Sequence, residues 1–379
     1  MANLGFMLIF YALISAAYGA LASFMAAFTR HRRLAVSGKA ALTLTCVLTL
    51  GAAGILVYLL FNRDYSVLYI AKNSSNDLPA FYTLTAFWSS LEGSHFFWTM
   101  ILSVVSTVAA WTHAKENEHI MPYVQGVLMV ILTWMLYLLM THSDPFKVDL
   151  PAPLNGNGMN ELLQNIYMAI HPPLLFLGYV SCAIPFAYAI AALLYGDITE
   201  GWLKTVRRWA LFAFSVLTTA IALGGKWAYV ELGWAGYWAW DPVENSSFFP
   251  WLLMLSLIHT LLIQEKLGLL KRLSLMIAMI AFFMTYFGTF ITRSGVITSV
   301  HAFGEGPIGP NYLVFLAVLA SISALIYAIR APSILPSDPK KAWGIAKESA
   351  LAIMLFFTFI IWCNRFYWHH ISYCLRSHQ

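Results

Sequence analysis

Long apolar stretches recur along almost the whole chain, and they leave few folds open to it. A bilayer core of about 30 Å needs roughly 20 helical residues, and such a helix satisfies its own backbone hydrogen bonds. Charged residues make up only 10% of the 379 residues, against about 25% in soluble domains. We therefore expect an all-α, polytopic transmembrane bundle of about nine or ten spans. The clear apolar runs lie at 4–28, 40–60, 95–111, 123–141, 173–195, 210–230, 250–263, 273–291 and 311–330, and a weaker one at 349–363.

Basic residues are divided unequally between the two sets of connectors, which indicates how the bundle is oriented. One set contains Arg30, Arg32, Arg33, Lys39, Lys115, Lys204, Arg207, Arg208, Lys266, Lys271, Arg272, Arg330, Lys340, Lys341 and Lys347. Apart from the C-terminal tail, the opposite set contains only Arg63, Lys72, Lys147, Lys226 and Arg293. The positive-inside rule predicts that the first set is cytoplasmic and that the N-terminus lies outside. These cytoplasmic ends also explain the net charge of +5, so no nucleic-acid partner is indicated.

The cysteines exclude two classes of protein. Cys46, Cys182, Cys363 and Cys374 are scattered, and the chain contains neither a CxxC nor a CxxCH motif. It is therefore neither a thiol oxidoreductase of the usual kind nor a covalent haem carrier.

The segment 233–251 has the most unusual composition in the chain, reading GWAGYWAWDPVENSSFFPW. Five of the fourteen tryptophans, counting Trp227, fall within 25 residues. An aromatic belt at the membrane interface is the alternative, but belts scatter their aromatic residues over many helix ends. The concentration favours a platform on which a flat, largely apolar ligand stacks. The platform residues are Trp234, Tyr237, Trp238 and Trp240.

The same segment contains a helix start. Asp241 can act as the N-cap, Pro242 suits the first helical position, and Glu244 stands where a capping-box acid reaches back. Pro250 can open the next span in the same way. We expect a turn, then a short helix in the interface plane, then a spanning helix.

Two histidines are predicted to flank this platform on the outer face. His171 precedes two prolines, which disfavour a helical backbone at the histidine and place the start of the span just after it. His301 lies in the outer connector 292–311. Two imidazoles on one face are what a bis-histidine haem iron requires. Hydrogen-bonded interfacial histidines are the alternative.

Two further ionisable residues lie at or inside apolar runs. His259 is about nine residues into the span 250–263, roughly 13 Å down the helix, so we expect it near mid-membrane. An ionisable residue inside a span is a functional candidate; the alternative is an inter-helix hydrogen bond to Ser or Thr. Arg293, at the outer interface, either binds a haem propionate or extends its charge to the surface.

At these residues the chain resembles the cytochrome c haem lyases of the CcmF, CycK, NrfE and CcsA group. Residues 234–251 look like the tryptophan-rich "WWD" signature of that family. The resemblance covers about 1–357 and is closest to CcmF-type proteins. Supporting matches are SLEGS at 90–94, IHPPLL at 170–175, IH at 258–259, TRSG at 292–295 and SVHAF at 299–303.

The resemblance implies a function and a ligand set. In that family two outer histidines, here His171 and His301, ligate the haem being delivered, and the signature cradles it. A resident b-type haem is held by a further pair, of which His259 matches the first member. The second member belongs to a C-terminal half that this chain lacks. The implied role is to receive haem from a CcmE-like haem chaperone and present it to apocytochrome c and its thiol-handling complex.

The domain organisation and two rival functions complete the expectations. We expect one membrane domain at 1–363 with haem-handling function, and an atypical tail at 364–379 that indicates truncation or a frameshift. The implied location is the bacterial cytoplasmic membrane, with the functional face periplasmic. One rival is a haem exporter, although a single mid-span ionisable residue argues against a translocation path. The other is an inactive fragment, or one that depends on a separate C-terminal half.

Overall fold

Long helices with roughly aligned axes make up most of the computed structural model, which describes residues 1–113, 117–233, 236–295 and 308–335. Within these ranges, nine helices are long and apolar enough to cross a membrane. This confirms the predicted all-α polytopic bundle. The spanning helices are α1 (Ala2–Thr29), α2 (Arg32–Phe61), α5 (Leu91–Thr112), α6 (Met121–His142), α7 (Ile166–Tyr195), α8 (Glu200–Glu231), α9 (Pro242–Leu267), α10 (Lys271–Ser294) and α11 (Ile308–Ile334). The weak run 349–363, like the tail 364–379, lies outside the described residues.

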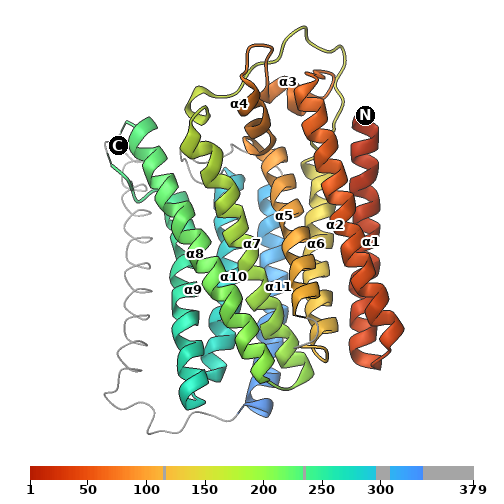
Figure 1. Ribbon diagram of the computed structural model, residues 1–379, viewed down its shortest axis with the longest axis vertical. Helices are drawn as coiled ribbons and strands as arrows, with labels where there is room; N and C mark the ends of the chain where they lie inside the picture. Colours follow the sequence, from red (N-terminus) through yellow and green to blue (C-terminus); the bar gives the residue numbers. More distant parts are fainter. Residues whose placement is uncertain (114–116, 234–235, 296–307, 336–379) are drawn as a thin grey trace.

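Neighbouring helices along the chain pack as antiparallel pairs, and α7 joins the pairs together (Figure 1). Helices α1 and α2 form one edge of the bundle, and α8 and α9 lie at the other. Helix α7 contacts α5, α6, α8, α9, α10 and α11 and is the most buried span. The short helices α3 (Leu68–Asn73) and α4 (Ala80–Thr85) lie at the end of the bundle that holds the N-terminus. We call this the outer end, after the predicted orientation, and the opposite one the inner end.

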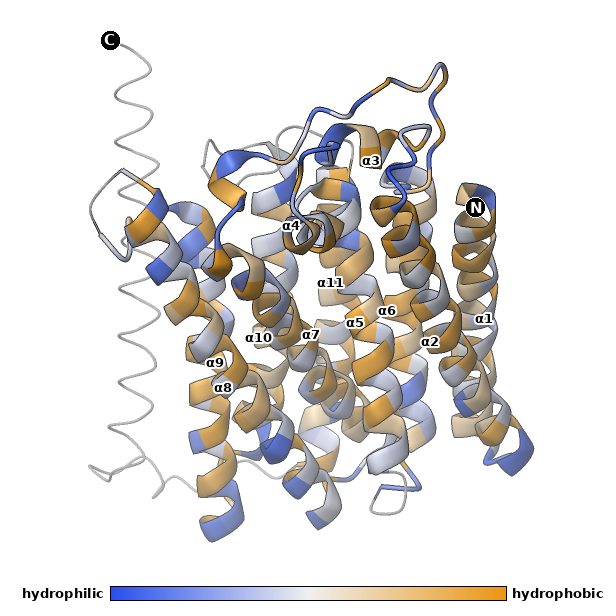
Figure 2. Cartoon of the chain, turned by 45° about the horizontal axis from the view of Figure 1, so that its top comes forward, coloured by the Kyte–Doolittle hydropathy of each residue, from blue (hydrophilic) through white to orange (hydrophobic). Residues whose placement is uncertain are grey.

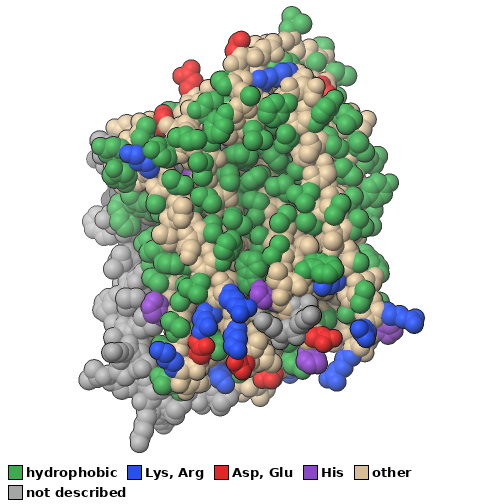
Figure 3. Space-filling view, viewed as in Figure 1, with side chains coloured by type: hydrophobic (Ala, Val, Ile, Leu, Met, Phe, Trp, Pro, Cys, Tyr) green, Lys and Arg blue, Asp and Glu red, His purple; other side chains and the backbone are tan. Residues whose placement is uncertain are grey.

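The distribution of polar and apolar residues changes along the length of the helices. The middle of the bundle is apolar and the polar residues gather at its two ends (Figure 2). On the face shown in Figure 3, most Lys and Arg side chains lie along the inner edge. Apolar side chains facing a bilayer stabilise this arrangement, and charged ends remain in water or at the headgroups.

Helix ends are formed by local signals that the sequence contains. The side chain of Thr199 accepts a hydrogen bond from the backbone N–H of Trp202 at the start of α8. Helices α7 and α9 end at Gly196 and Gly268, whose positive φ angles of 101° and 70° suit glycine because it has no β-carbon.

Helix α7 begins earlier than the sequence predicts. It starts at Ile166, so that His171 and both following prolines lie inside the helix. The side chain of Asn165 caps the first turn by accepting a hydrogen bond from Tyr167. Proline disfavours a helical conformation only at the residue before it. Packing against α8, together with the cost of unsatisfied backbone groups in an apolar medium, favours helix over the whole segment and outweighs that local effect. The prediction that the span starts after His171 is therefore wrong.

The start of α9 is partly as predicted. Asp241 and Glu244 form the expected capping box. The helix then continues without interruption through Pro250 to Leu267, so the separate short helix in the interface plane is not formed. Flanking helices α8 and α10 pack along α9 and keep it continuous.

Candidate functional site

His171 lies against α8 near the outer end of the bundle. Its Nδ1 is 2.7 Å from the backbone carbonyl oxygen of Ala220. A carbonyl only accepts, so Nδ1 is the protonated nitrogen and donates this bond. In the neutral ring the remaining lone pair is then on Nε2. A metal-ligating histidine is oriented in this way, with its second nitrogen donating to a backbone carbonyl.

His171 and the backbone of the tryptophan-rich segment each approach one of two consecutive glycines of α8. A β-carbon added to Gly224 would lie only 2.7 Å from His171 Cε1, and one added to Gly225 would lie 2.9 Å from the carbonyl oxygen of Tyr237. Real β-carbons do not approach other atoms so closely. The absence of two β-carbons therefore permits the imidazole and the aromatic segment to lie against the same turn of α8.

The aromatic side chains of the segment form two groups of contacting rings. Trp238 lies edge-on to Trp240, with ring centroids 6.2 Å apart and planes at 86°, and also contacts Phe248. Phe248 stacks on Trp251 at 5.3 Å. Tyr237 stacks on Tyr229 of α8 at 4.5 Å with nearly parallel planes. Tyr237, Trp238 and Trp240 therefore pack with rings of α8 and α9, and their role as a ligand platform stays a prediction.

Part of this array faces outward. Tyr237 is 56% exposed and Trp240 is 39% exposed. Trp240 also has a φ of 59°, in the left-handed region that side chains other than glycine rarely adopt. Such strain persists only where surrounding contacts hold it, and it is common at ligand sites.

Asp241 and Glu244 hold the backbone of the segment in place. One carboxylate oxygen of Glu244 accepts hydrogen bonds from the backbone N–H groups of Ala239, at 2.9 Å, and Asp241, at 3.2 Å. Asp241 in turn accepts from Val243 at 3.0 Å. These bonds fix the turn on both sides of Trp240. The two acids organise the loop, as the sequence analysis predicts.

Arg293 connects two helices. It is 1% exposed, and it donates from Nη1 to the carbonyl of Leu91 and from Nη2 to the hydroxyl of Ser94, both at 2.9 Å. The alternative that Arg293 extends to the surface is wrong, because its guanidinium is buried between α10 and the start of α5. Its proposed contact with a propionate stays a prediction.

His259 lies deeper in the bundle than expected. Because α9 begins at Pro242, His259 is seventeen residues from the outer end of the helix, roughly 25 Å, and only eight from Leu267. Its Nδ1 is 2.8 Å from the carbonyl oxygen of Leu255 in its own helix. Among the described residues it makes no hydrogen bond to a Ser or Thr of a neighbouring helix.

The structure contains a buried histidine that the sequence analysis does not single out. His95 is fully buried in α5, with Nδ1 2.6 Å from the hydroxyl of Ser143 and its ring edge-on to Tyr312. Contacts with the end of α6 and with α11 enclose it. Of the predicted site residues, Trp234 and His301 lie outside the described residues.

The fold and these motifs define a membrane protein of cytochrome c assembly. The sequence model of the family described as "Cytochrome C assembly protein" matches residues 88–298, which include His171, the tryptophan-rich segment and Arg293. The chain belongs to this family.

Among the curated proteins similar to this chain are CcmF and NrfE proteins of three bacteria. The chain is 42% identical over 283 residues to "Cytochrome c-type biogenesis protein CcmF" of Pseudomonas aeruginosa, covering 74% of this chain and 43% of that protein. It is 38% identical over 304 residues to the protein of the same name from Escherichia coli, covering 79% and 46%. It is 36% identical over 335 residues to "Cytochrome c-type biogenesis protein NrfE" of Haemophilus influenzae, covering 87% and 52%.

A solved structure has the same arrangement of helices. The chain superposes on "Cytochrome c Heme Lyase CcmF" with a TM-score of 0.79 at 29% identity, covering 94% of this chain and 54% of that one. The chain thus spans about half the length of the relatives it matches. The findings support a CcmF-type member of the family and a multi-pass membrane protein.

Proposed function

We propose that this chain binds haem at its outer face and presents it for covalent attachment to apocytochrome c. His171 and His301 would supply the two axial ligands. Trp234, Tyr237, Trp238 and Trp240 would form the stacking surface, with Arg293 near a propionate. The observation that carries the proposal is the common position of His171 and the aromatic segment on Gly224 and Gly225 of α8.

The chemistry of attachment comes from the substrates. Each thiol of an apocytochrome CxxCH motif adds its S–H across a vinyl C=C bond of the haem. The protein would contribute positioning and control of the iron through its ligands. The Nδ1–Ala220 hydrogen bond would fix the orientation of the His171 ring, and the Glu244 and Asp241 bonds would fix the turn around Trp240.

A resident b-type haem would need two imidazoles at one depth. His259 would be one ligand, and the structure suits this role only in part. Its Nδ1 is oriented by Leu255, yet no histidine among the described residues contacts its ring. The second ligand would come from outside the described residues.

The partners and location follow from the same proposal. Haem would arrive from a CcmE-like chaperone, and apocytochrome would be handed over by its thiol-handling complex. The chain would span the bacterial cytoplasmic membrane with the N-terminus and the haem site on the periplasmic side. The basic residues along the inner edge support this orientation (Figure 3).

Single histidine replacements test the proposal. We expect purified protein to carry haem with a low-spin absorption spectrum that changes when His171→Gly or His301→Gly is introduced. His142→Gly is the matched control, because His142 is half-buried at the outer end of α6 and its Nδ1 is hydrogen-bonded to the hydroxyl of neighbouring Thr141. Haem content and spectrum unchanged in both site variants would overturn the ligand assignment.

A further inference from the structure

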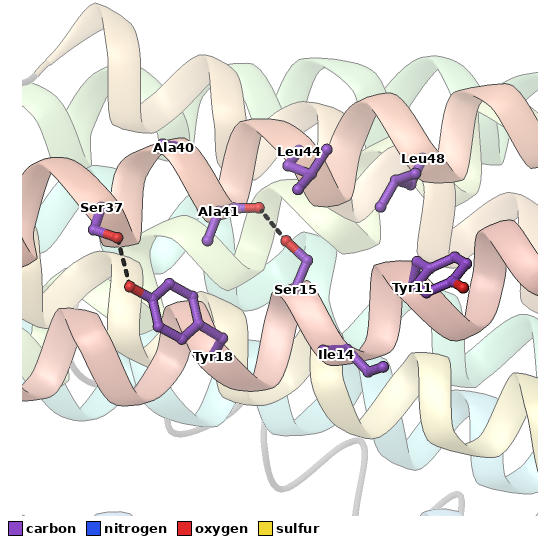
Figure 4. A pocket seen from close by; sticks show the side chains of 9 residues that line it. All are labelled: Tyr11, Ile14, Ser15, Tyr18, Ser37, Ala40, Ala41, Leu44 and Leu48. Carbon is purple, nitrogen blue, oxygen red and sulfur yellow. Dashed lines mark hydrogen bonds between the residues drawn. The ribbon is translucent and has the colours of Figure 1, made fainter.

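A groove of about 720 Å³ runs between α1 and α2, at the edge of the bundle away from the tryptophan-rich segment. Figure 4 shows its lining, which comes from these two helices alone. The lining residues are Tyr11, Ile14, Ser15, Tyr18, Ser37, Ala40, Ala41, Leu44 and Leu48.

The greater part of the groove is apolar and open to the surroundings of the bundle. Tyr11, Ile14 and Leu44 are each about half exposed. Two of the lining residues on α2, Ala40 and Ala41, have small side chains, which leave space between the two helices. On a spanning helix pair such a surface faces lipid, and a hydrocarbon chain has the shape and polarity to fill it.

The inner end of the groove is polar. The Tyr18 side chain points toward the inner end of α2, and its hydroxyl is 2.6 Å from that of Ser37 (Figure 4). Either oxygen can be the donor, and the other hydroxyl then keeps its proton for an outside acceptor. The Ser15 hydroxyl, by contrast, donates to the carbonyl of Ala41. One hydroxyl proton is therefore available where the apolar groove ends.

Positive charge continues beyond this hydroxyl pair. Arg33 precedes Ser37 by four residues, so it lies on the same face of α2 about 6 Å nearer the inner end. Arg30, Arg32 and Arg33 are all exposed at the connection between α1 and α2. No acidic residue occurs in the chain before Asp64. The order along the groove is thus apolar surface, hydroxyl donor and then cations that form no ion pair among the described residues.

We propose that this groove is a binding site for one anionic glycerophospholipid of the membrane. An acyl chain lies between α1 and α2, a glycerol ester or phosphate oxygen accepts from the Tyr18–Ser37 pair, and the phosphate is paired with Arg33 and its neighbours. Basic residues at an inner membrane edge attract anionic headgroups. The hydroxyl pair and the groove add a fixed position for one molecule.

Native mass spectrometry of the purified full chain, titrated with phosphatidylglycerol or phosphatidylcholine, tests the proposal. We expect one phosphatidylglycerol to be retained in preference to phosphatidylcholine. Arg33→Gln should weaken retention about fivefold, since one basic residue near a charged headgroup contributes about that factor. Tyr18→Phe should weaken it as well, whereas Tyr58→Phe, an exposed tyrosine of α2 that does not line the groove, should leave it unchanged.

Two further measurements distinguish the proposal from other occupants. Ala40→Phe fills the groove without removing a charge and should abolish preferential retention; circular dichroism establishes that the variant is folded. A photoreactive residue at Leu44 should label lipid in membranes. Equal retention of both lipids, unchanged retention in Arg33→Gln and Tyr18→Phe, or labelling of a partner's helix in place of lipid would each overturn the proposal.

Discussion

Replacing Gly224 by alanine separates the position of His171 from its chemical identity. The added β-carbon would stand 2.7 Å from Cε1 and 2.8 Å from Nδ1 of the imidazole. Since the opposing atoms belong to a side chain, the ring must move, and the hydrogen bond from Nδ1 to Ala220 is lost or lengthened.

The net cost in stability should be about 1–3 kcal/mol, and the effect on haem binding should be large. Overpacking costs about 1–3 kcal/mol and a lost hydrogen bond about 1 kcal/mol. Alanine in place of glycine in a helix returns about 1 kcal/mol. A ligand displaced by about 1 Å at a reacting centre can cost roughly a hundredfold in rate. We expect Gly224→Ala to insert into membranes normally and to lose most of its His171-dependent haem spectrum.

Haem titration of the purified variant, together with cytochrome c assembly in cells that lack the native protein, provides the assay. Gly54→Ala is the matched control, because Gly54 is an exposed helical glycine of α2 and an added β-carbon there meets no atom within 4 Å. If Gly224→Ala bound haem as the parent does while His171→Gly did not, the glycine would not position the ligand and our reasoning would be refuted.

Three other changes test the remaining parts of the site. The double variant Trp238→Leu, Trp240→Leu keeps apolar surface but removes aromatic stacking, which is worth about 1 kcal/mol per ring pair. We expect it to insert into the membrane normally and to lose haem transfer. Wild-type levels of cytochrome c in cells with this variant would count against a stacking platform. Glu244→Gln weakens the two hydrogen bonds that the carboxylate accepts from Ala239 and Asp241 by about 1 kcal/mol each. The loosened turn should be cleaved faster by protease at residues 236–241, and an unchanged cleavage rate would contradict this. Because no histidine among the described residues contacts His259, residues 1–379 expressed alone should hold no bis-histidine b-haem. Two haems per chain, one lost in His259→Ala, would contradict this.

Local patterns were sufficient wherever the physical cause is local. The nine spans follow from apolar length, because a bilayer demands a helix of about twenty residues whatever its neighbours are. The capping box of Asp241 and Glu244 follows from three residues in sequence, since its bonds join backbone and side chains within one turn. The same holds for the role of these two acids in the turn.

Where tertiary contacts compete with local preference, the sequence alone misled. Pro172 and Pro250 both suggested helix boundaries, yet both lie inside continuous helices. Arg293 suggested an interfacial charge, and it is buried between α10 and α5. In each case packing with a distant segment outweighs a preference worth a few kcal/mol or less.

The amino-acid sequence by itself determined the fold class, the spans and the candidate ligands, since apolar length, caps and residue type are properties of short segments. Only the tertiary structure decided which of these lie together. The position of His171 beside the tryptophan-rich segment depends on two missing β-carbons in α8, at Gly224 and Gly225. No periodicity or motif expresses that arrangement, because it exists only when residues 49 positions apart in the chain, on α7 and α8, are packed side by side.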